Sequence, residues 1–203
     1  MSIPVSTAEI AADAWVDAEP SRAWSSLDAT AKRERLLCAA GRVFARDGLD
    51  AAMPTVAAEA GAGVASLYRQ FPSKHELLAT LVVRRLEQIA DAAEEATARE
   101  GDHWTALTEM LWTIVDRTSG DDFLGEARIL VAEHPEVAAA TDRATDALER
   151  LLAAARAEGR LRADATTLDL RLLFAATRAA KQVEPEAWRR MLALLIDALD
   201  AGA

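Results

Sequence analysis

Four hydrogen-bonding side chains stand close together in one short stretch of the sequence: Ser66, Tyr68, Arg69 and Gln70. Hydroxyl and guanidinium groups bind phosphate oxygens, and guanidinium and amide groups also bind the edges of bases in the major groove of DNA. These residue types at this spacing therefore indicate a surface that contacts nucleic acid.

The surrounding residues predict a helix-turn-helix, over residues 53–72, that positions this surface. Pro54 suits the first turn of a short helix, because proline lacks the backbone N–H that this turn leaves unpaired in any helix. Gly61 supplies the turn, since glycine adopts a positive φ without steric penalty. A second short helix is predicted from about Gly63 to Phe71. Leu67 and Phe71 are expected to point inward, which turns the polar residues outward.

The segment from Lys32 to Leu81 resembles the DNA-binding domain of the tetracycline-repressor (TetR) family over its whole length. The matching motifs are L-L-x-A-A-x-x-V-F-A-x-x-G from residue 36, V-A-x-x-A-G from residue 56, S-L-Y-R-Q-F-P-S-K from residue 66 and L-L from residue 77. Two positions depart from the family pattern. Ala52 stands where a Ser or Thr usually caps the second helix, and Gln70 replaces the commoner His. Loss of a cap costs about 1 kcal/mol, which a packed domain tolerates.

This resemblance implies a homodimeric, ligand-responsive transcriptional regulator, most often a repressor. The helix at residues 63–71 is then expected to enter the major groove, with the two heads about 34 to 36 Å apart on a near-palindromic operator. A small-molecule effector that binds better to another spacing of the heads would release the DNA. The sequence does not separate a repressor from an activator that uses the same head.

The residues expected to face DNA fall into two groups. Groups near base edges would specify the sequence, and hydroxyl or basic groups near phosphates would position the protein. Lys74 lies in the first turn of the next helix, whose N-terminus attracts phosphate. Lys32 and Arg33 lie at the start of the helix predicted at 31–46. Exposed basic residues at such a helix end are as often only solvated as they are bound to phosphate. The base-facing candidates are Ala62, Gly63, Val64, Ala65, Arg69 and Gln70, and the phosphate-facing candidates are Lys32, Arg33, Thr55, Ser66, Tyr68 and Lys74.

The net charge of the whole chain, −10, at first argues against a nucleic-acid partner, because neutralisation of phosphates drives most protein–DNA affinity. Its distribution reverses that impression. Residues 31–75 contain seven Lys or Arg and four Asp or Glu, a local charge of +3, which leaves −13 for the rest of the chain. A basic module on an acidic body orients a protein on DNA.

The composition predicts an all-α fold, since alanine dominates and β-branched runs are few. We expect three regions: a mobile N-terminal arm at 1–30, a three-helix DNA-binding domain at 31–76, whose family signature extends to about 90, and a helical effector-binding and dimerisation domain at 77–203. No DNA role is assigned to the arm, and the alternative to a fully mobile arm is that residues 10–16 form a helical turn or two that packs on the body. The helices outside the helix-turn-helix are predicted at 31–46, 74–99, 103–118, 123–133, 136–158, 165–181 and 185–199.

Two further sites are predicted in the last region. The family places its ligand cavity among the helices that follow residue 100, although an apolar stripe there is usually core and polar groups beside it usually form surface ion pairs. The last two helices are apolar around much of their circumference, so they are expected to pair with a second copy, the alternative being that they pack only on their own chain. The pocket candidates are Trp104, Leu107, Leu111, Trp112, Arg128 and His134, and the dimer-interface candidates are Leu172, Phe174, Trp188, Leu192, Leu195 and Leu199.

Other classes of function receive little support from the sequence. No constellation of nucleophile, base or metal ligands suggests an enzyme, and no cofactor or metal is expected, since the three histidines are scattered and Cys38 is the single cysteine. No apolar run reaches membrane-spanning length and the acidic N-terminus does not resemble a secretory signal, so we expect a cytoplasmic protein without a membrane partner. The remaining alternative is a non-catalytic helical adaptor, which would not explain the basic, motif-dense segment.

Overall fold

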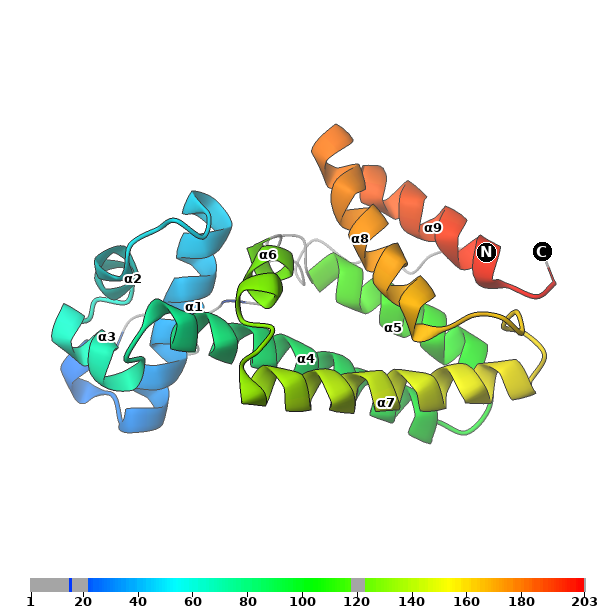
Figure 1. The fold of residues 1–203 in the computed structure, drawn as a ribbon, viewed down its shortest axis with the longest axis horizontal. Coiled ribbons are helices and arrows are strands. Elements are labelled where there is room, and N and C mark those ends of the chain that lie inside the picture. The colour runs from blue at the N-terminus through cyan, green and yellow to red at the C-terminus, as the bar shows by residue number, and fades with distance from the viewer. Residues whose placement is uncertain (1–14, 16–21, 118–122, 203) are drawn as a thin grey trace. The chain divides into compact units, whose positions relative to one another are not determined.

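The computed structural model describes Trp15, residues 22–117 and residues 123–202, and within these residues the chain is helical with no β-strand (Figure 1). The predicted all-α fold is therefore confirmed. The elements are the 3-10 helix η2 (Trp24–Ser26) and the α-helices α1 (Ala29–Asp47), α2 (Met53–Glu59), α3 (Val64–Gln70), α4 (Lys74–Ala98), α5 (His103–Arg117), α6 (Phe123–Leu130), α7 (Pro135–Ala157), α8 (Thr167–Val183) and α9 (Ala187–Leu199).

Helix ends follow local chemistry. Helix α1 begins two residues before the predicted position because Asp28 caps it, its Oδ1 accepting a hydrogen bond from Ala31 N at 2.8 Å. Gly48 ends the same helix with a φ of 76°. Thr166 and Asp169 form a reciprocal capping box at the start of α8.

The described chain forms two compact units. The first contains α1, α2, α3, the part of α4 up to Arg84, and the segment Asp116–Ala138 with α6. The second contains residues 85–115, with the rest of α4 and α5, and residues 139–203, with most of α7 and all of α8 and α9. The predicted DNA-binding domain at 31–76 lies within the first unit, and its boundary with the region at 77–203 stays a prediction.

Each unit has its own apolar core. In the first unit α1, α3 and the start of α4 converge, and Leu67 and Phe71 point inward as the sequence predicts, with exposed fractions of 0% and 1%. In the second unit Arg143 of α7 forms ion pairs with Glu87, Asp91 and Glu94, which lie along one face of α4. The largest fully buried side chains are Leu36, Phe44, Leu67, Phe71, Leu77 and Leu81 in the first unit and Leu107, Leu111, Leu151, Leu152, Leu170 and Leu173 in the second.

The predicted N-terminal arm is described only at Trp15 and at residues 22–30, while residues 1–14 and 16–21 lie outside the described part. Arg35 Nη1 donates a hydrogen bond to Arg22 O at 2.6 Å, and Lys32 Nζ lies 5.9 Å from the ring centre of Trp24. Residues 22–24 therefore lie against α1, and the mobility of the arm stays a prediction. Among the described residues, every helix is too short or too polar to cross a bilayer.

Candidate nucleic-acid interface

The turn between α2 and α3 is built from backbone hydrogen bonds and one glycine. Gly61 has a φ of 64°, which favours glycine, and its N–H donates to Ala58 O at 3.0 Å. Ala62 N then donates to Ala57 O at 2.9 Å. Gly63 caps α3 without a side chain, so the first turn of α3 is open to close approach of a ligand. Ala52, at the start of α2, forms no capping side-chain hydrogen bond, as the sequence predicts.

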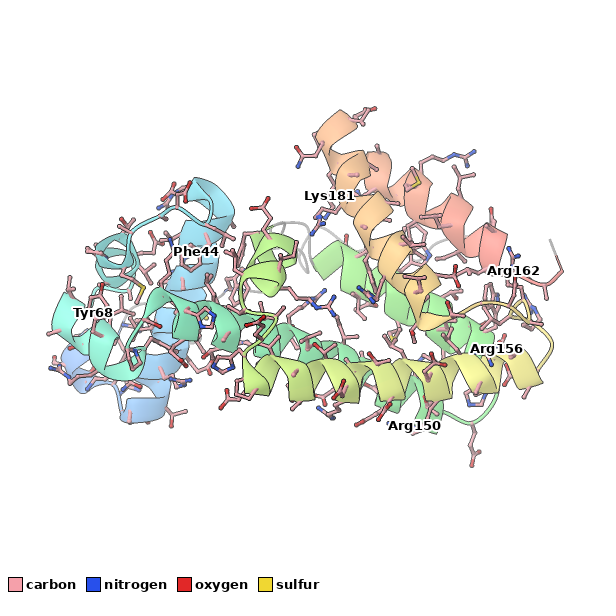
Figure 2. All side chains as sticks on the ribbon, viewed as in Figure 1. Phe44, Tyr68, Arg150, Arg156, Arg162 and Lys181 are labelled. Carbon is pink, nitrogen blue, oxygen red and sulfur yellow. The ribbon has the colours of Figure 1, made fainter. Side chains whose placement is uncertain are left out.

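Helix α3 presents one face to the core and the other outward. Leu67 is fully buried, whereas Val64 and Tyr68 are 41% and 44% exposed, and Ala65 and Arg69 are also exposed. Figure 2 shows Tyr68 on the outer side of α3 and Phe44 inside the unit. The seven-residue helix therefore holds the apolar anchor and the hydrogen-bonding groups on opposite sides.

Two polar side chains of the predicted surface have partners within the unit. Arg69 Nη2 donates a hydrogen bond to Ser66 Oγ at 2.8 Å, so the two side chains occupy one exposed turn of α3. Arg33 of α1 donates from Nη1 to Gln70 O at 3.3 Å, and its guanidinium carbon lies 4.4 Å from the ring centre of Phe71. Arg33 thus holds the C-terminal end of α3 against α1, a role that the sequence did not indicate.

Lys74 lies at the start of α4, where the backbone favours anions. Ser73 Oγ accepts a hydrogen bond from Glu76 N at 3.1 Å, which is one of the two hydrogen bonds of a capping box. Lys74 Nζ lies 5.6 Å from the ring centre of Phe44, and the side chain is half-buried. The ammonium group and the first-turn N–H groups of α4 both lie at the end of the helix that attracts phosphate.

Two acidic residues of the DNA-binding domain, Asp47 and Glu59, pair with two arginines of α1. Glu59 of α2 accepts from Arg42 Nε at 3.0 Å and from Arg46 Nη1 at 3.4 Å, and Arg46 also pairs with Asp47. Hydrogen bonds from Arg42 and from Arg46 lower the pKa of Glu59 and of Asp47 respectively. Arg42 and Arg46 of α1 therefore form ion pairs with Glu59 that hold α1 and α2 together.

The basic groups left over are those predicted to meet DNA. Arg35 is buried with an exposed fraction of 6%, which removes it from the surface charge that the sequence suggests. Within the described part of the chain, no carboxylate forms an ion pair with Lys32, Arg33, Arg69 or Lys74. These four residues give the unit positive charge that no carboxylate of the described residues neutralises.

Two protein-family models match successive parts of the chain. The model described as bacterial regulatory proteins of the tetR family matches residues 36–81. A model of a TetR C-terminal domain, described as the C-terminal domain of SbtR-like transcriptional regulators, matches residues 102–201. The chain belongs to the TetR family.

Solved structures of TetR-family regulators share the fold. A regulator from Streptomyces coelicolor is 27% identical with a TM-score of 0.62, covering 84% of this chain and 99% of its own. One from Mycobacterium vanbaalenii is 29% identical with a TM-score of 0.59, covering 83% and 95%. A complex of SmeT with triclosan is 26% identical with a TM-score of 0.59, covering 83% and 89%; SmeT is the repressor of a multidrug efflux pump of Stenotrophomonas maltophilia. No curated protein matches the chain significantly.

This chain is therefore a TetR-family transcriptional regulator, and regulators of this family are DNA-binding proteins rather than enzymes. The match of the DNA-binding model to residues 36–81 decides against the helical adaptor. In the described residues, no group of three or more His, Cys, Asp or Glu side chains could hold a metal ion.

The six predicted pocket residues of this TetR-family chain are divided between the two units. Leu107 and Leu111 of α5 are fully buried, and Trp104 is 6% exposed. Trp112 is half-buried, with its ring centre 6.1 Å from that of Trp188. Arg128 and His134 belong to the first unit, where His134 Nε2 lies 3.4 Å from Glu76 Oε2. The pocket formed by these residues stays a prediction.

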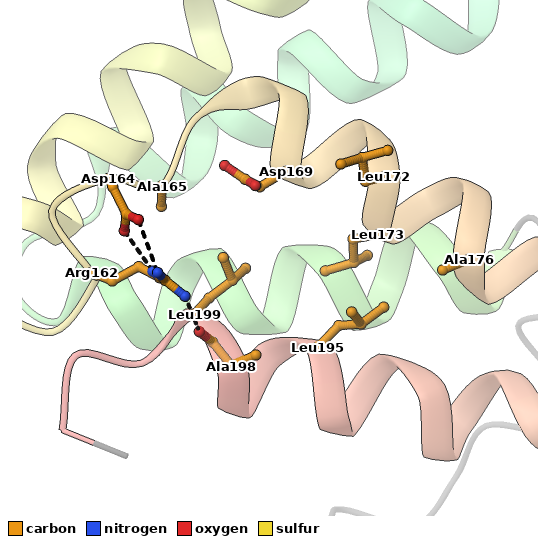
Figure 3. Close-up of a pocket in the computed structure, with 10 residues that line it drawn as sticks. All are labelled: Arg162, Asp164, Ala165, Asp169, Leu172, Leu173, Ala176, Leu195, Ala198 and Leu199. Atoms are coloured by element: carbon orange, nitrogen blue, oxygen red, sulfur yellow. Dashed lines mark hydrogen bonds and ion pairs between the residues drawn. The ribbon is translucent and has the colours of Figure 1, made fainter.

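A cavity of about 310 Å³ lies elsewhere, between α8, α9 and the segment before α8 (Figure 3). Arg162 pairs with Asp164 at its polar end, with Nε 2.6 Å from Oδ1, and donates to Ala198 O at 3.3 Å. Leucines of α8 and α9 form the apolar wall. None of the six predicted pocket residues lines this cavity, which is lined by Arg162, Asp164, Ala165, Asp169, Leu172, Leu173, Ala176, Leu195, Ala198 and Leu199.

The predicted dimer residues differ in how much of each side chain is exposed and so available to a partner chain. Trp188, Leu192 and Leu199 are 3%, 0% and 8% exposed, because they pack against their own chain. Leu172 is 58% exposed, and Phe174 and Leu195 are half-buried. Sequence periodicity found the apolar stripe of α9 but not which side of it the chain's own helices cover. Exposed apolar residues that the sequence analysis missed are Leu168 on α8 and Leu194 on α9.

Proposed function

We propose that this regulator is a homodimeric repressor that binds a near-palindromic operator through α3 and is released by a small-molecule effector. The observation that carries the DNA-binding part is the outward face of α3. Tyr68 and Arg69 are exposed there while Leu67 is buried, and the basic residues beside them have no carboxylate partners among the described residues. Side chains so placed can reach phosphates and base edges in a major groove.

The proposed roles follow from where each group lies. Lys32, Lys74, Thr55, Ser66 and Tyr68 would bind phosphates, and Arg33 would do so while also holding α3. Arg69 and Gln70 would hydrogen-bond base edges, and Ala62, Gly63, Val64 and Ala65 would lie close to the groove floor because the start of α3 carries only small side chains.

Dimerisation is supported by an unpartnered apolar face on α8. Leu168, Leu172, Ala175 and Ala179 are all exposed and follow the spacing i, i+4, i+7, i+11, which places them on one side of the helix. Leu194 of α9 adds to the exposed apolar surface of this helix pair. Packing α8 and α9 against the same helices of a second copy would form a four-helix bundle and cover these leucines.

An effector is supported by the family match and by a relative whose structure contains a drug. SmeT has been solved with triclosan and shares 26% identity with this chain. The triclosan complex supports a small molecule as the effector of this regulator, and the residues proposed to line its pocket in the second unit are Trp104, Leu107, Leu111 and Trp112 of α5. Thermal shift against a panel of small molecules tests this part, since a ligand that binds only the folded state raises the melting temperature.

The DNA-binding proposal is tested by selecting bound duplexes from a random pool with the wild type and Tyr68→Ala at physiological salt. Enrichment of a near-palindrome by the wild type alone is the expected result. A non-palindromic enriched site would overturn the symmetric operator. Enrichment by neither protein, with both folded, would overturn sequence-specific binding.

A further inference from the structure

A glycine lies where helix α1 has no conformational need for one. Gly41 is in the body of this 19-residue helix and is buried. Its backbone is not among those with a positive φ, so an ordinary L-residue could adopt the same conformation. Glycine inside a helix destabilises it relative to alanine. The position therefore calls for a reason outside the helix.

The reason is the indole of Trp15. A Cβ atom added to Gly41 would lie 2.1 Å from Cδ2 of Trp15 and 2.5 Å from its Cε2 and Cε3. These atoms form the rigid centre of the indole, which cannot bend away as the end of a flexible side chain could. The ring thus occupies the volume that any other residue at position 41 would need.

Trp15 also contacts two other helices of the same unit. Arg42 Nη1 donates a hydrogen bond to Trp15 O at 2.8 Å, which fixes the backbone beside α1. The ring centre of Trp15 lies 5.9 Å from the guanidinium carbon of Arg84 on α4 and 6.2 Å from the ring centre of Phe123 on α6. One side chain therefore joins α1, α4 and α6.

The contacts of the arm show a consistent direction along α1. Trp15 meets Arg42, Arg22 meets Arg35, and Trp24 meets Lys32. As the residue number in the arm increases, the number of the contacted residue in α1 decreases. The described arm residues therefore run antiparallel to α1. Trp15 is thus the far end of an ordered series of contacts and not an isolated one.

The packing of the Trp15 indole on Gly41, which we call the seat of Trp15, is connected to a proposed DNA contact through two phenylalanines. The ring of Phe123 lies 5.8 Å from that of Phe44, which is 1% exposed. Phe44 in turn lies 5.6 Å from Lys74 Nζ. Displacing Trp15 would loosen Phe123 and so alter the packing beneath Lys74, because close-packed aromatic rings leave little room for independent movement.

We propose that Trp15 is a positioning residue for the DNA-binding head: seated on Gly41, it fixes α6 against α1 and, through Phe123 and Phe44, holds Lys74 in place for phosphate. The seat itself is independent of the proposed function. Its effect on DNA binding rests on that function, and the two parts are therefore measured separately.

The seat is tested by melting the full-length wild type, Gly41→Ala, Trp15→Ala and the double variant. With Trp15 present, the added methyl group meets the indole, so Gly41→Ala is expected to lower the melting temperature. In the Trp15→Ala background that space is open and alanine only favours the helix, so the same change is expected to raise it. A rise in both backgrounds, or a fall in both, would overturn the seat.

Trp24→Ala is the matched control, because Trp24 is the other described tryptophan of the arm and contacts Lys32 instead of Gly41. In the Trp24→Ala background Gly41→Ala is expected to lower the melting temperature as it does in the wild type. If Gly41→Ala raised the melting temperature in the Trp24→Ala background, the loss of either arm tryptophan would be enough to make alanine favourable at position 41. That result would overturn the specific pairing of Trp15 with Gly41.

The positioning role is tested by the dissociation constant for the selected operator. Trp15→Ala is expected to weaken binding by about two- to thirtyfold, the range found for residues that contact neither ligand. Trp15→Phe, which keeps a ring, is expected to restore most of the affinity, and the loss on Trp15→Ala should shrink in the Lys74→Ala background. Wild-type affinity of Trp15→Ala would overturn the role even where the seat is established. If the wild type itself enriches no duplex, the proposed function fails, and melting still decides the seat.

Discussion

Lys74 differs from Arg42 and Arg46 of the same unit in that it forms no ion pair with a carboxylate among the described residues. Because it lies in the first turn of α4, it is expected to bind phosphate without regard to sequence. Lys74→Ala should weaken binding to all duplexes alike and reduce the slope of log affinity against log salt by about 1. Affinity measured by fluorescence anisotropy at several salt concentrations checks this.

Arg46→Ala is the control for Lys74→Ala, because Arg46 lies in the same head but pairs with Asp47 and Glu59. Its removal should leave the salt slope unchanged, although it should lower stability. An unchanged slope for Lys74→Ala would remove Lys74 from the phosphate contacts.

Arg69 is expected to carry sequence discrimination. It is exposed on α3 and is held by Ser66 within one turn of the helix, so its guanidinium is presented on the outward face. Arg69→Ala should relax the preference at particular base pairs of the operator by about 1 to 3 kcal/mol and leave the others unaffected. Binding to a set of singly substituted operators measures this. An equal loss on every operator would assign Arg69 to the backbone instead.

At the scale of residues, the sequence predicts whether a side chain points inward or outward better than it predicts which residue that side chain contacts. The inward Leu67 and the outward Tyr68 follow from helical periodicity, which is local. The burial of Arg35 and the ion pair of Arg42 do not follow from periodicity, because their partners, Arg22 and Glu59, come from other parts of the chain. Charge counting could not separate basic residues that fasten helices together from those left for DNA.

At the scale of elements, His103 fastens three helix ends of the second unit. Its backbone N–H donates to Glu158 Oε2 at 2.9 Å, its ring Nδ1 pairs with the same carboxylate, and Nε2 lies 3.3 Å from Thr97 O. The contacts join the end of α4, the start of α5 and the residue after α7. The hydrogen bond that His103 donates to the Glu158 carboxylate lowers the pKa of Glu158. The same hydrogen bond, aided by the one to Thr97 O, raises the pKa of His103.

Stability should depend on pH through this pair. The folded-state pKa of His103 lies above its usual value near 6.5, so the charged ring contributes fully below about pH 6.5 and the contribution is lost as pH rises through the folded pKa. Because the folded-state pKa of Glu158 is lowered, the contribution of the pair to stability persists as pH falls to about 4.5, the usual pKa of a glutamate, and is lost only below it. The difference in melting temperature between wild type and His103→Gln should be largest between pH 4.5 and pH 6.5 and shrink as pH rises through the folded pKa of His103. Glu158→Gln should show the same profile, and a difference independent of pH would contradict this account.

Helix bounds follow from local signals wherever a cap or a glycine is present. Gly48 and Gly61 mark their turns in the sequence, and both have positive φ in the structure. The exposed side of α8 could not be predicted, since a helix that is apolar around most of its circumference does not show which side its own chain covers.

At the scale of the whole molecule, dimerisation should depend on residues that the single chain leaves exposed. Leu172→Asp places a charge in the centre of the α8 face and is expected to convert the dimer to a monomer, which size-exclusion chromatography with light scattering would detect. Ile129→Asp is the control, because Ile129 is 77% exposed but lies on α6. A dimer that persists in Leu172→Asp and dissociates in Ile129→Asp would move the interface away from α8.

The seat of Trp15 on Gly41 also constrains how this sequence can evolve. Mutation of position 41 is blocked while the tryptophan is present, but loss of the tryptophan opens that position to alanine and then to larger residues. Once a side chain occupies the space, a tryptophan that returns at position 15 finds no room. The combination of a tryptophan at position 15 with a side chain at position 41 is therefore disfavoured, and related chains that lack the glycine should also lack the tryptophan.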